Sequence, residues 1–382
     1  STLPAGNNKL SYPSAGVAFI PSELFKSSMP SWFTFAKIYG SWGKKPLTLD
    51  IYQNNFLYDI QQNQWNGNFL TTTPGTIPDP TLKGSLITSY EAGLDLRFIK
   101  NKLGVLINYY NETAADQPVG VSISGVSGFT TRIVNASTVK RSGIEVTING
   151  NVVSNKNFNW TLTKTFGWLM KNPVTKIIEG QDKLLLGAGT FGTRYARAFQ
   201  EINKDWGQLI GGGFTTNSSG QKLINPTTGL YVSGDANYNW GSIVPKITGG
   251  FQSLMTYKDF TLNLSLDYQF GGKFFSLTES WGMFSGLLDY TASTNDRGKN
   301  VRDPLSEGGG VRVTGVSSVD GKTPVDTYVD GFTYFHQFYS SSIAAPFVHS
   351  LSFVKMREIS LGYNLPVQRW GLTSKWCKAA NI

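Results

Sequence analysis

The fold class of this chain is decided by the stretch Phe260-Thr261-Leu262-Asn263-Leu264-Ser265-Leu266-Asp267-Tyr268-Gln269-Phe270. Apolar and polar side chains alternate along it, and residues 86–98 repeat the pattern. Because successive side chains of a strand point to opposite faces, each stretch would form a strand with one apolar and one polar face. Strands of this kind suit a wall between lipid and water, as in an antiparallel transmembrane β-barrel.

The composition agrees with an all-β protein. Of the 382 residues, 42 are Gly, 13% are aromatic and only 15% are charged, which favours a β-rich chain over an α/β enzyme. No apolar run approaches the ~20 residues that a membrane helix requires. This does not exclude a membrane barrel, since half of each barrel strand is polar.

The numbers and spacing of Lys, Arg, Cys and His argue against several other classes of function. The net charge is +9, but Lys and Arg are scattered and the longest run is Lys44-Lys45, so we expect no nucleic-acid partner. Cys377, His336 and His349 are the only Cys and His residues, and their spacing does not suit a metal. We therefore predict neither a metal site nor a cofactor.

The predicted strands are joined by connections that alternate between short and very long. Short turns near residues 100–102, 154–157 and 257–259 alternate with long connections, of which residues 171–240 and 271–347 are the longest. This alternation is typical of an up-and-down barrel with tight periplasmic turns and long extracellular loops. We predict strands near residues 10–20, 33–43, 86–98, 103–111, 136–150, 158–170, 243–256, 260–270 and 348–363, and the start of another near Trp376.

The alternation also assigns individual side chains to the two faces of the wall. We expect lipid next to Leu94, Leu264, Leu266 and Leu361, and the lumen next to Asp95, Glu145, Asp267 and Glu358. Lys164 interrupts an apolar face, so we place it near a membrane interface, with Trp168 in the aromatic girdle. The run 348–363 changes phase around Lys355 and Arg357, which predicts a β-bulge there.

Short motifs follow one another along the chain in a characteristic order. They include Tyr12-Pro13-Ser14-Ala15-Gly16-Val17-Ala18-Phe19, Lys37-Ile38-Tyr39-Gly40-Ser41-Trp42-Gly43, Asp79-Pro80-Thr81-Leu82-Lys83, Tyr90-Glu91-Ala92-Gly93-Leu94-Asp95, Asn108-Tyr109-Tyr110-Asn111-Glu112-Thr113, Ser142-Gly143-Ile144-Glu145-Val146 and Arg357-Glu358-Ile359-Ser360-Leu361-Gly362-Tyr363-Asn364-Leu365-Pro366. In this order they resemble the C-terminal barrel half of the SusC/RagA-type TonB-dependent outer-membrane transporters of Bacteroidetes. Trp42 and Ala136-Ser137 depart from the family pattern.

The resemblance implies a plugged barrel of ~22 strands in the bacterial outer membrane. It implies import of an oligosaccharide or a peptide with energy supplied by the TonB complex, and a SusD-like surface lipoprotein as partner. We interpret residues 1–382 as the C-terminal part of the barrel, without the N-terminal plug and the first strands. The first and last strands are then expected to have unpaired edges within these residues, or to pair with another chain or with segments outside them, because nine or ten strands cannot close so wide a barrel.

Candidate ligand-binding residues are aromatic and polar side chains of the two longest loops. Flat aromatic faces suit sugar rings and peptide side chains alike, although for any single residue the favoured interpretation is that it packs the loops together or against the lipoprotein. The candidates are Trp206, Tyr231, Tyr238, Trp240, Trp281, Phe284, Asp289 and Tyr290, with Asp235 and Asn295 as further polar groups. We expect both loops on one side of the barrel, exposing apolar patches that include residues 334–339.

Other interpretations of the loops are weaker. Residues 187–192 read G-x-G-x-x-G before a helix-like stretch at 195–202, but no second parallel strand follows, so a Gly-rich loop is favoured over a dinucleotide site. Asn295–Arg297 and Asp303-Pro304 lack the spacing of an EF-hand. His336 lies among aromatic residues and no G-x-S-x-G occurs, so no enzyme is predicted. A passive porin or structural barrel, and a secreted lectin-like β-sandwich, remain the alternative functions.

Overall fold

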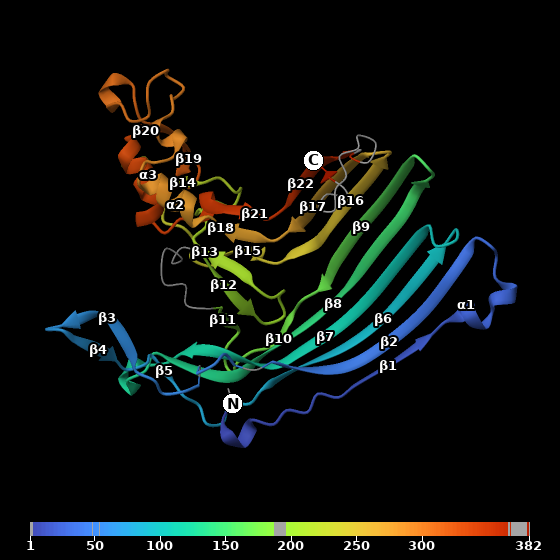
Figure 1. The fold of residues 1–382 in the computed structure, drawn as a ribbon. Coiled ribbons are helices and arrows are strands. Elements are labelled where there is room, and N and C mark those ends of the chain that lie inside the picture. Colours follow the sequence, from blue (N-terminus) through green and yellow to red (C-terminus); the bar gives the residue numbers. More distant parts are fainter. Residues whose placement is uncertain are drawn as a thin grey trace.

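The computed structural model describes residues 3–47, 49–52, 54–186, 196–365, 367 and 380–381. Its largest element is a 12-stranded sheet that forms an open, curved wall (Figure 1). Adjacent strands on the main path of this wall are antiparallel. The strands along the wall are β1 (Ser14–Phe19), β2 (Phe33–Leu47), β6 (Ser85–Phe98), β7 (Leu103–Ser122), β8 (Thr131–Ser154), β9 (Phe158–Lys171), β16 (Pro245–Tyr257), β17 (Phe260–Gly271), β22 (Phe353–Leu365) and β23 (Ala380–Asn381). Two short strands, β5 (Thr76–Ile77) and β10 (Val174–Lys176), also pair with β8.

The short turns lie at one end of the wall and the long connections at the other (Figure 1). The β6–β7 turn places Ile99, Lys100 and Asn101 in the left-handed region, with φ of 54°, 54° and 64°. At the β8–β9 turn, the Asn155 side chain accepts hydrogen bonds from the N–H groups of Asn157 and Phe158. At the same end, α1 (Pro21–Leu24) and η2 (Lys26–Ser28) connect β1 to β2. The predicted short–long alternation is confirmed.

The strand register shows that the wall has two chemically different faces. Leu264 pairs with Ser253 on one side and Ile359 on the other, and directly paired residues point to the same face. Leu361, on the same face as Ile359, is 69% exposed. Following such pairs across the sheet places the predicted leucines on one face and the predicted acids on the other: Leu94, Leu264, Leu266 and Leu361 against Asp95, Glu145, Asp267 and Glu358.

The acidic face is the one that the long loops cover. Val139 of β8 lies six residues before Glu145 and therefore points the same way. It is buried against Val174 and Ile177, and the neighbouring Ser137 donates a hydrogen bond to Gln200 of β12. Because these segments lie on the concave side of the wall (Figure 1), the acids face the lumen and the leucines point outwards.

The predicted β-bulge is present in β22. Met356 and Glu358 pair with consecutive residues of β17, so Arg357 is the extra residue. Its guanidinium reaches the carboxylate of Asp267 at 2.6 Å, which secures the irregular position. The prediction of a single strand over residues 348–363 is wrong, because β21 (Val348–Ser350) separates from β22 and pairs with β18 (Lys273–Phe275).

Two further predictions about local structure need correction. The first strand begins at Ser14 rather than at residue 10, because Leu10 packs against a buried cluster that includes Leu3 and Leu82. The helix-like stretch 195–202 contains a strand, β12 (Ala196–Glu201), between β11 (Lys183–Leu185) and β13 (Gln208–Gly211). Pairing on both sides satisfies its backbone and overrides its helix propensity. The Gly-rich residues 187–192, like Trp376 and Cys377, lie outside the described residues.

The remaining elements belong to the long connections, except η1, which precedes β1. A hairpin of β3 (Asp59–Trp65) and β4 (Asn68–Thr72) projects from the loop end (Figure 1). β15 (Tyr238–Ser242) completes the β11–β12–β13 sheet, and β14 (Leu223–Ile224), β19 (Val311–Ser317) and β20 (Pro324–Val329) form another. The helices are α2 (Leu277–Phe284) and α3 (Gly331–Ser340), with short 3-10 turns η1 (Ala5–Asn7), η3 (Gly125–Ser127), η4 (Asp289–Ala292), η5 (Leu305–Glu307) and η6 (Ala345–Phe347).

Within the described residues the wall does not close on itself. There, β1 pairs only with β2, and β23 only with β22. No helix in the described part of the chain has the length and apolarity to cross a membrane.

Candidate ligand-binding site in the long loops

The described parts of the two longest connections fold together into one unit, here called the loop layer (residues 171–186, 196–240 and 271–347). The Ala344 N–H donates to the Gly212 carbonyl at 2.7 Å, and the Tyr231 N–H donates to the buried Gln337 side chain at 2.9 Å. Strand β14 of the first segment also pairs with β19 of the second. The loop layer lies at one end of the wall, as predicted (Figure 1).

The expectation that residues 334–339 form an exposed apolar patch is wrong for the residues at its centre. Phe335 and Phe338 are buried, and they pack with Met283, Ile343 and Phe347. Helix α3 produces this arrangement, since residues three apart lie on the same face of a helix. These aromatic residues therefore form the hydrophobic core of the loop layer.

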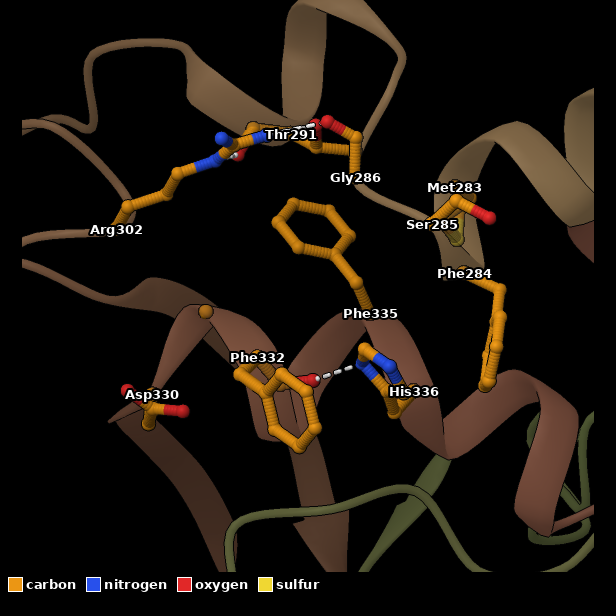
Figure 2. Close-up of a pocket in the computed structure, with 11 residues that line it drawn as sticks. Met283, Phe284, Ser285, Gly286, Thr291, Arg302, Asp330, Phe332, Phe335 and His336 are labelled. Atoms are coloured by element: carbon orange, nitrogen blue, oxygen red, sulfur yellow. Dashed lines mark hydrogen bonds between the residues drawn. The ribbon is translucent and has the colours of Figure 1, made fainter.

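A first pocket lies between α2 and α3 and has a volume of about 530 Å³ (Figure 2). Part of its wall is aromatic: the His336 ring stacks on Phe332 at 3.8 Å and lies 4.4 Å from Phe284. The residues that line it are Met283, Phe284, Ser285, Gly286, Thr291, Arg302, Asp330, Gly331, Phe332, Phe335 and His336.

The charged groups of this first pocket are already engaged by the protein. Arg302 donates from Nε to the Thr291 carbonyl at 2.7 Å and from Nη2 to the Gly286 carbonyl at 2.5 Å (Figure 2). Asp330 caps α3 by accepting from the Thr333 N–H at 3.1 Å. His336 Nδ1 lies 2.8 Å from the Phe332 carbonyl and must donate, because a carbonyl only accepts. The first pocket therefore offers a ligand mainly apolar surface.

A second pocket, here called the Lys222 pocket, lies where the two segments of the loop layer meet. It has a volume of about 540 Å³. The rings of Tyr238 and Trp240 form one wall, with centroids 5.1 Å apart. The lining residues are Gly213, Phe214, Thr215, Thr216, Gly220, Lys222, Asp235, Tyr238, Trp240 and Ala345.

The Lys222 pocket contains two charges of opposite sign that are not paired with each other. Lys222 Nζ lies 3.9 Å from the centre of the Phe214 ring, and burial lowers the pKa of this lysine. Among the described residues, no carboxylate forms an ion pair with it. The Asp235 carboxylate accepts a hydrogen bond only from the Asn237 N–H of its own turn, at 2.9 Å, within the part of the chain that is described.

The structure brings only some of the predicted site residues together. Tyr238, Trp240 and Asp235 line the Lys222 pocket, whereas Phe284 lines the first pocket. Trp206 packs against the Val139 cluster beside the wall. No sequence pattern pointed to Lys222, which follows a polar turn and reaches the aromatic rings only through the fold.

The other predicted residues lie within the loop layer and outside the linings of both pockets. Tyr231 and Tyr290 pack on its core, and burial, followed by the charges of Glu279 and Asp289, raises the pKa of Tyr290 to about 12. The rings of Trp281 and Phe284 lie 5.8 Å apart in an edge contact. Asp289 is exposed and accepts from the Tyr290 N–H at 2.7 Å.

The polar residues considered for a hydroxyl or calcium site hold the loop together instead. Asn295 donates to the carbonyls of Gly308 and Gly310. Asp296 accepts from Arg312 at 3.0 Å, and the Tyr328 hydroxyl also donates to it. No group of three or more His, Cys, Asp or Glu side chains that could hold a metal occurs in the described ranges.

Comparison with known proteins identifies the family. The family model described as TonB dependent receptor-like, β-barrel, matches residues 2–336. The chain belongs to this TonB-dependent receptor β-barrel family. The TonB-dependent receptor P3 of Formosa agariphila is 25% identical over 96% of the chain, and SusC of Bacteroides thetaiotaomicron is 23% identical over 54%. The predicted resemblance to SusC/RagA-type receptors is confirmed.

The solved structures agree with this β-barrel fold. The RagAB peptide transporter superposes with a TM-score of 0.71 at 17% identity, covering 100% of this chain and 40% of the matched chain. The RagAB peptide importer in its closed-closed state gives 0.69 at 18% identity. The chain thus spans 36% of the length of receptor P3 and 40% of the matched RagAB chain. As a TonB-dependent receptor barrel of SusC/RagA type, it is an outer-membrane protein.

Proposed function

We propose that this chain takes part in the TonB-dependent import of an oligosaccharide or a peptide across the outer membrane. In this proposal residues 1–382 supply the C-terminal part of the barrel wall, and the plug and the TonB-contacting segment lie elsewhere in the receptor. The observation that carries the proposal is the loop layer, which covers the acidic face of a wall whose other face is apolar. A ligand held there would lie directly over the lumen.

We also propose a SusD-like lipoprotein as the partner that covers the loop layer. Support comes from exposed apolar side chains at this end of the molecule, such as Leu287 (81% exposed) and Phe332 (71%). The β3–β4 hairpin carries further exposed rings, including Trp65 and Phe69. A two-stranded hairpin is marginally stable alone, and apolar patches usually mark a binding surface.

Uptake measurements test the import. A strain that carries the full-length receptor should accumulate labelled ligand, and deletion of the receptor gene or of tonB should abolish this uptake. Peptide and oligosaccharide mixtures should be supplied separately, because the proposal leaves both open. Uptake that continues at an unchanged rate without TonB would contradict energised import and would favour a passive pore.

Co-purification tests the partner. Tagged full-length receptor, extracted with detergent, should recover a surface lipoprotein. Replacing residues 312–328, most of the β19–β20 hairpin at the outer tip of the loop layer (Figure 1), by a short Gly/Ser linker should reduce this recovery. Barrel assembly, measured by heat-modifiable migration on gels, serves as the control. Undiminished recovery after this replacement and after shortening of residues 171–240 would mean that the loop layer does not hold the partner.

A further inference from the structure

The first pocket and the Lys222 pocket differ in how their charged side chains are bonded. In the first pocket, Arg302 donates hydrogen bonds to two backbone carbonyls, and Asp330 accepts a hydrogen bond at the N-terminus of α3. In the Lys222 pocket, neither Lys222 nor Asp235 has an ionic partner among the residues that the structure describes. Among the described residues, Lys222 Nζ donates no hydrogen bond and the Asp235 carboxylate accepts only one, so the Lys222 pocket presents a cation and an anion with capacity to bind a ligand.

Of the two charged side chains in the Lys222 pocket, Lys222 has fewer hydrogen-bond partners than Asp235. Its ammonium is partly withdrawn from water, and its contacts are the rings of Phe214 at 3.9 Å and Tyr231 at 5.1 Å. Cation–π contacts return only part of the lost hydration energy. A carboxylate that entered the pocket would supply the missing charge-assisted hydrogen bond, which is stronger in such a partly desolvated place.

The opposite charge and the aromatic wall limit what else the ligand can be. Asp235 can accept hydrogen bonds from N–H or ammonium groups, and its negative charge repels a second acid. Tyr238 and Trp240 offer apolar ring surface next to both charges. A neutral oligosaccharide would leave both charges unpaired, and a polyuronate would bring negative charge to Asp235.

We propose that the Lys222 pocket binds the carboxyl-terminal part of a short peptide. The terminal carboxylate pairs with Lys222, peptide or terminal nitrogens donate to Asp235, and a side chain packs on Trp240 and Tyr238. The pocket volume of about 540 Å³ accommodates two or three residues, within the usual range of ligand sites. This inference rests on the proposed import function and selects the peptide from its two ligand classes.

Binding to purified full-length receptor in detergent tests the proposal. The probes are synthetic tripeptide pools with free termini, the same pools with amidated carboxyl termini, and neutral and uronic-acid oligosaccharides, measured by ligand-observed NMR. We expect the free-carboxylate pool to bind at least ten-fold more tightly than the amidated pool. Lys222→Met should abolish this difference, and Lys222→Arg should preserve most of it. Asp235→Asn should weaken binding of the free pool several-fold.

The variants have suitable controls. Lys222→Met keeps the length of the stem, and the backbone carbonyl of residue 222 still accepts from the Val316 N–H at 3.0 Å, so the local fold is retained. Lys299→Met removes an exposed lysine elsewhere in the loop layer and should leave binding unchanged.

Three results would overturn the assignment: equal binding of the free and amidated pools, unchanged peptide binding by Lys222→Met, or preferential binding of either oligosaccharide. Because the binding assay requires neither TonB nor a partner, it separates this inference from the proposed function. Peptide binding that depends on Lys222, together with uptake that does not depend on TonB, would refute the import mechanism and leave the pocket assignment standing.

Discussion

The assignment of the two faces of the wall predicts a large difference between two neighbouring positions of β17. Leu264 lies on the apolar face, opposite Ser253 and Ile359. Ser265, the next residue, lies on the lumen face opposite Glu358. Both are at nearly the same height in the membrane, so substituting each by Arg compares the faces at a constant depth.

The free-energy cost of Leu264→Arg follows from the position of Leu264 along the strand. It lies four residues beyond Phe260, the first residue of β17, which at ~3.4 Å per residue is about 14 Å along the strand. A tilt of ~35–45° converts this to about 10 Å across the membrane, near the middle of an apolar band ~25 Å tall. An Arg at the midplane on the lipid face costs ~2–4 kcal/mol. Leu264→Arg should therefore lower the folding equilibrium constant by about 30- to 1,000-fold.

The matched variant Ser265→Arg should cost less than ~1 kcal/mol, since its guanidinium faces the aqueous lumen near Glu358. Urea titration of the full-length receptor in lipid vesicles, with intrinsic fluorescence as the readout, measures both free energies of unfolding. A cost for Ser265→Arg that equals or exceeds that of Leu264→Arg would refute the assignment of the faces.

Two further predictions concern the loop layer. Phe338→Ala should destabilise it by ~3–5 kcal/mol, because the ring is 3% exposed among Tyr231, Tyr334 and Phe347. Limited proteolysis should then cut the loop layer while the barrel stays intact. Phe332 is an exposed ring on the same helix, so Phe332→Ala should leave the cleavage rate unchanged. Equal cleavage of both variants would contradict this prediction. Tyr290→Phe should be neutral or stabilise by up to ~1 kcal/mol, because its buried hydroxyl has no hydrogen-bond partner among the described residues. Because the pKa of Tyr290 is raised to about 12 in the folded protein, the unfolded chain loses this proton first, so the folded loop layer becomes less stable as the pH rises from ~10 towards 12. Hydrogen exchange across this pH range should show a loss of amide protection in the loop layer of the wild type and a smaller loss in Tyr290→Phe. Identical profiles would refute the role of Tyr290 ionisation.

The sequence alone determined the strands of the wall and the face to which each side chain points. A strand repeats every two residues, so the alternation in residues 260–270 fixed both the secondary structure and the face of each side chain. A β-bulge changes this phase by one residue, and for that reason the irregular position near Arg357 could be located without a structure. Short turns carry local signals too, and their order predicted which end of the wall holds the long connections.

The loop layer was decided only by the tertiary structure. Residues 196–201 have no strand pattern of their own and become β12 because neighbours on both sides supply hydrogen bonds. The interior position of Phe338 depends on Phe214, more than a hundred residues earlier in the chain. Lys222 and Ala345, a similar distance apart in the chain, line the same pocket at a seam closed by the Ala344–Gly212 hydrogen bond. Contacts over such distances in sequence leave no local periodicity, so the pocket and its unpaired charges exist only once the two longest connections have folded against each other.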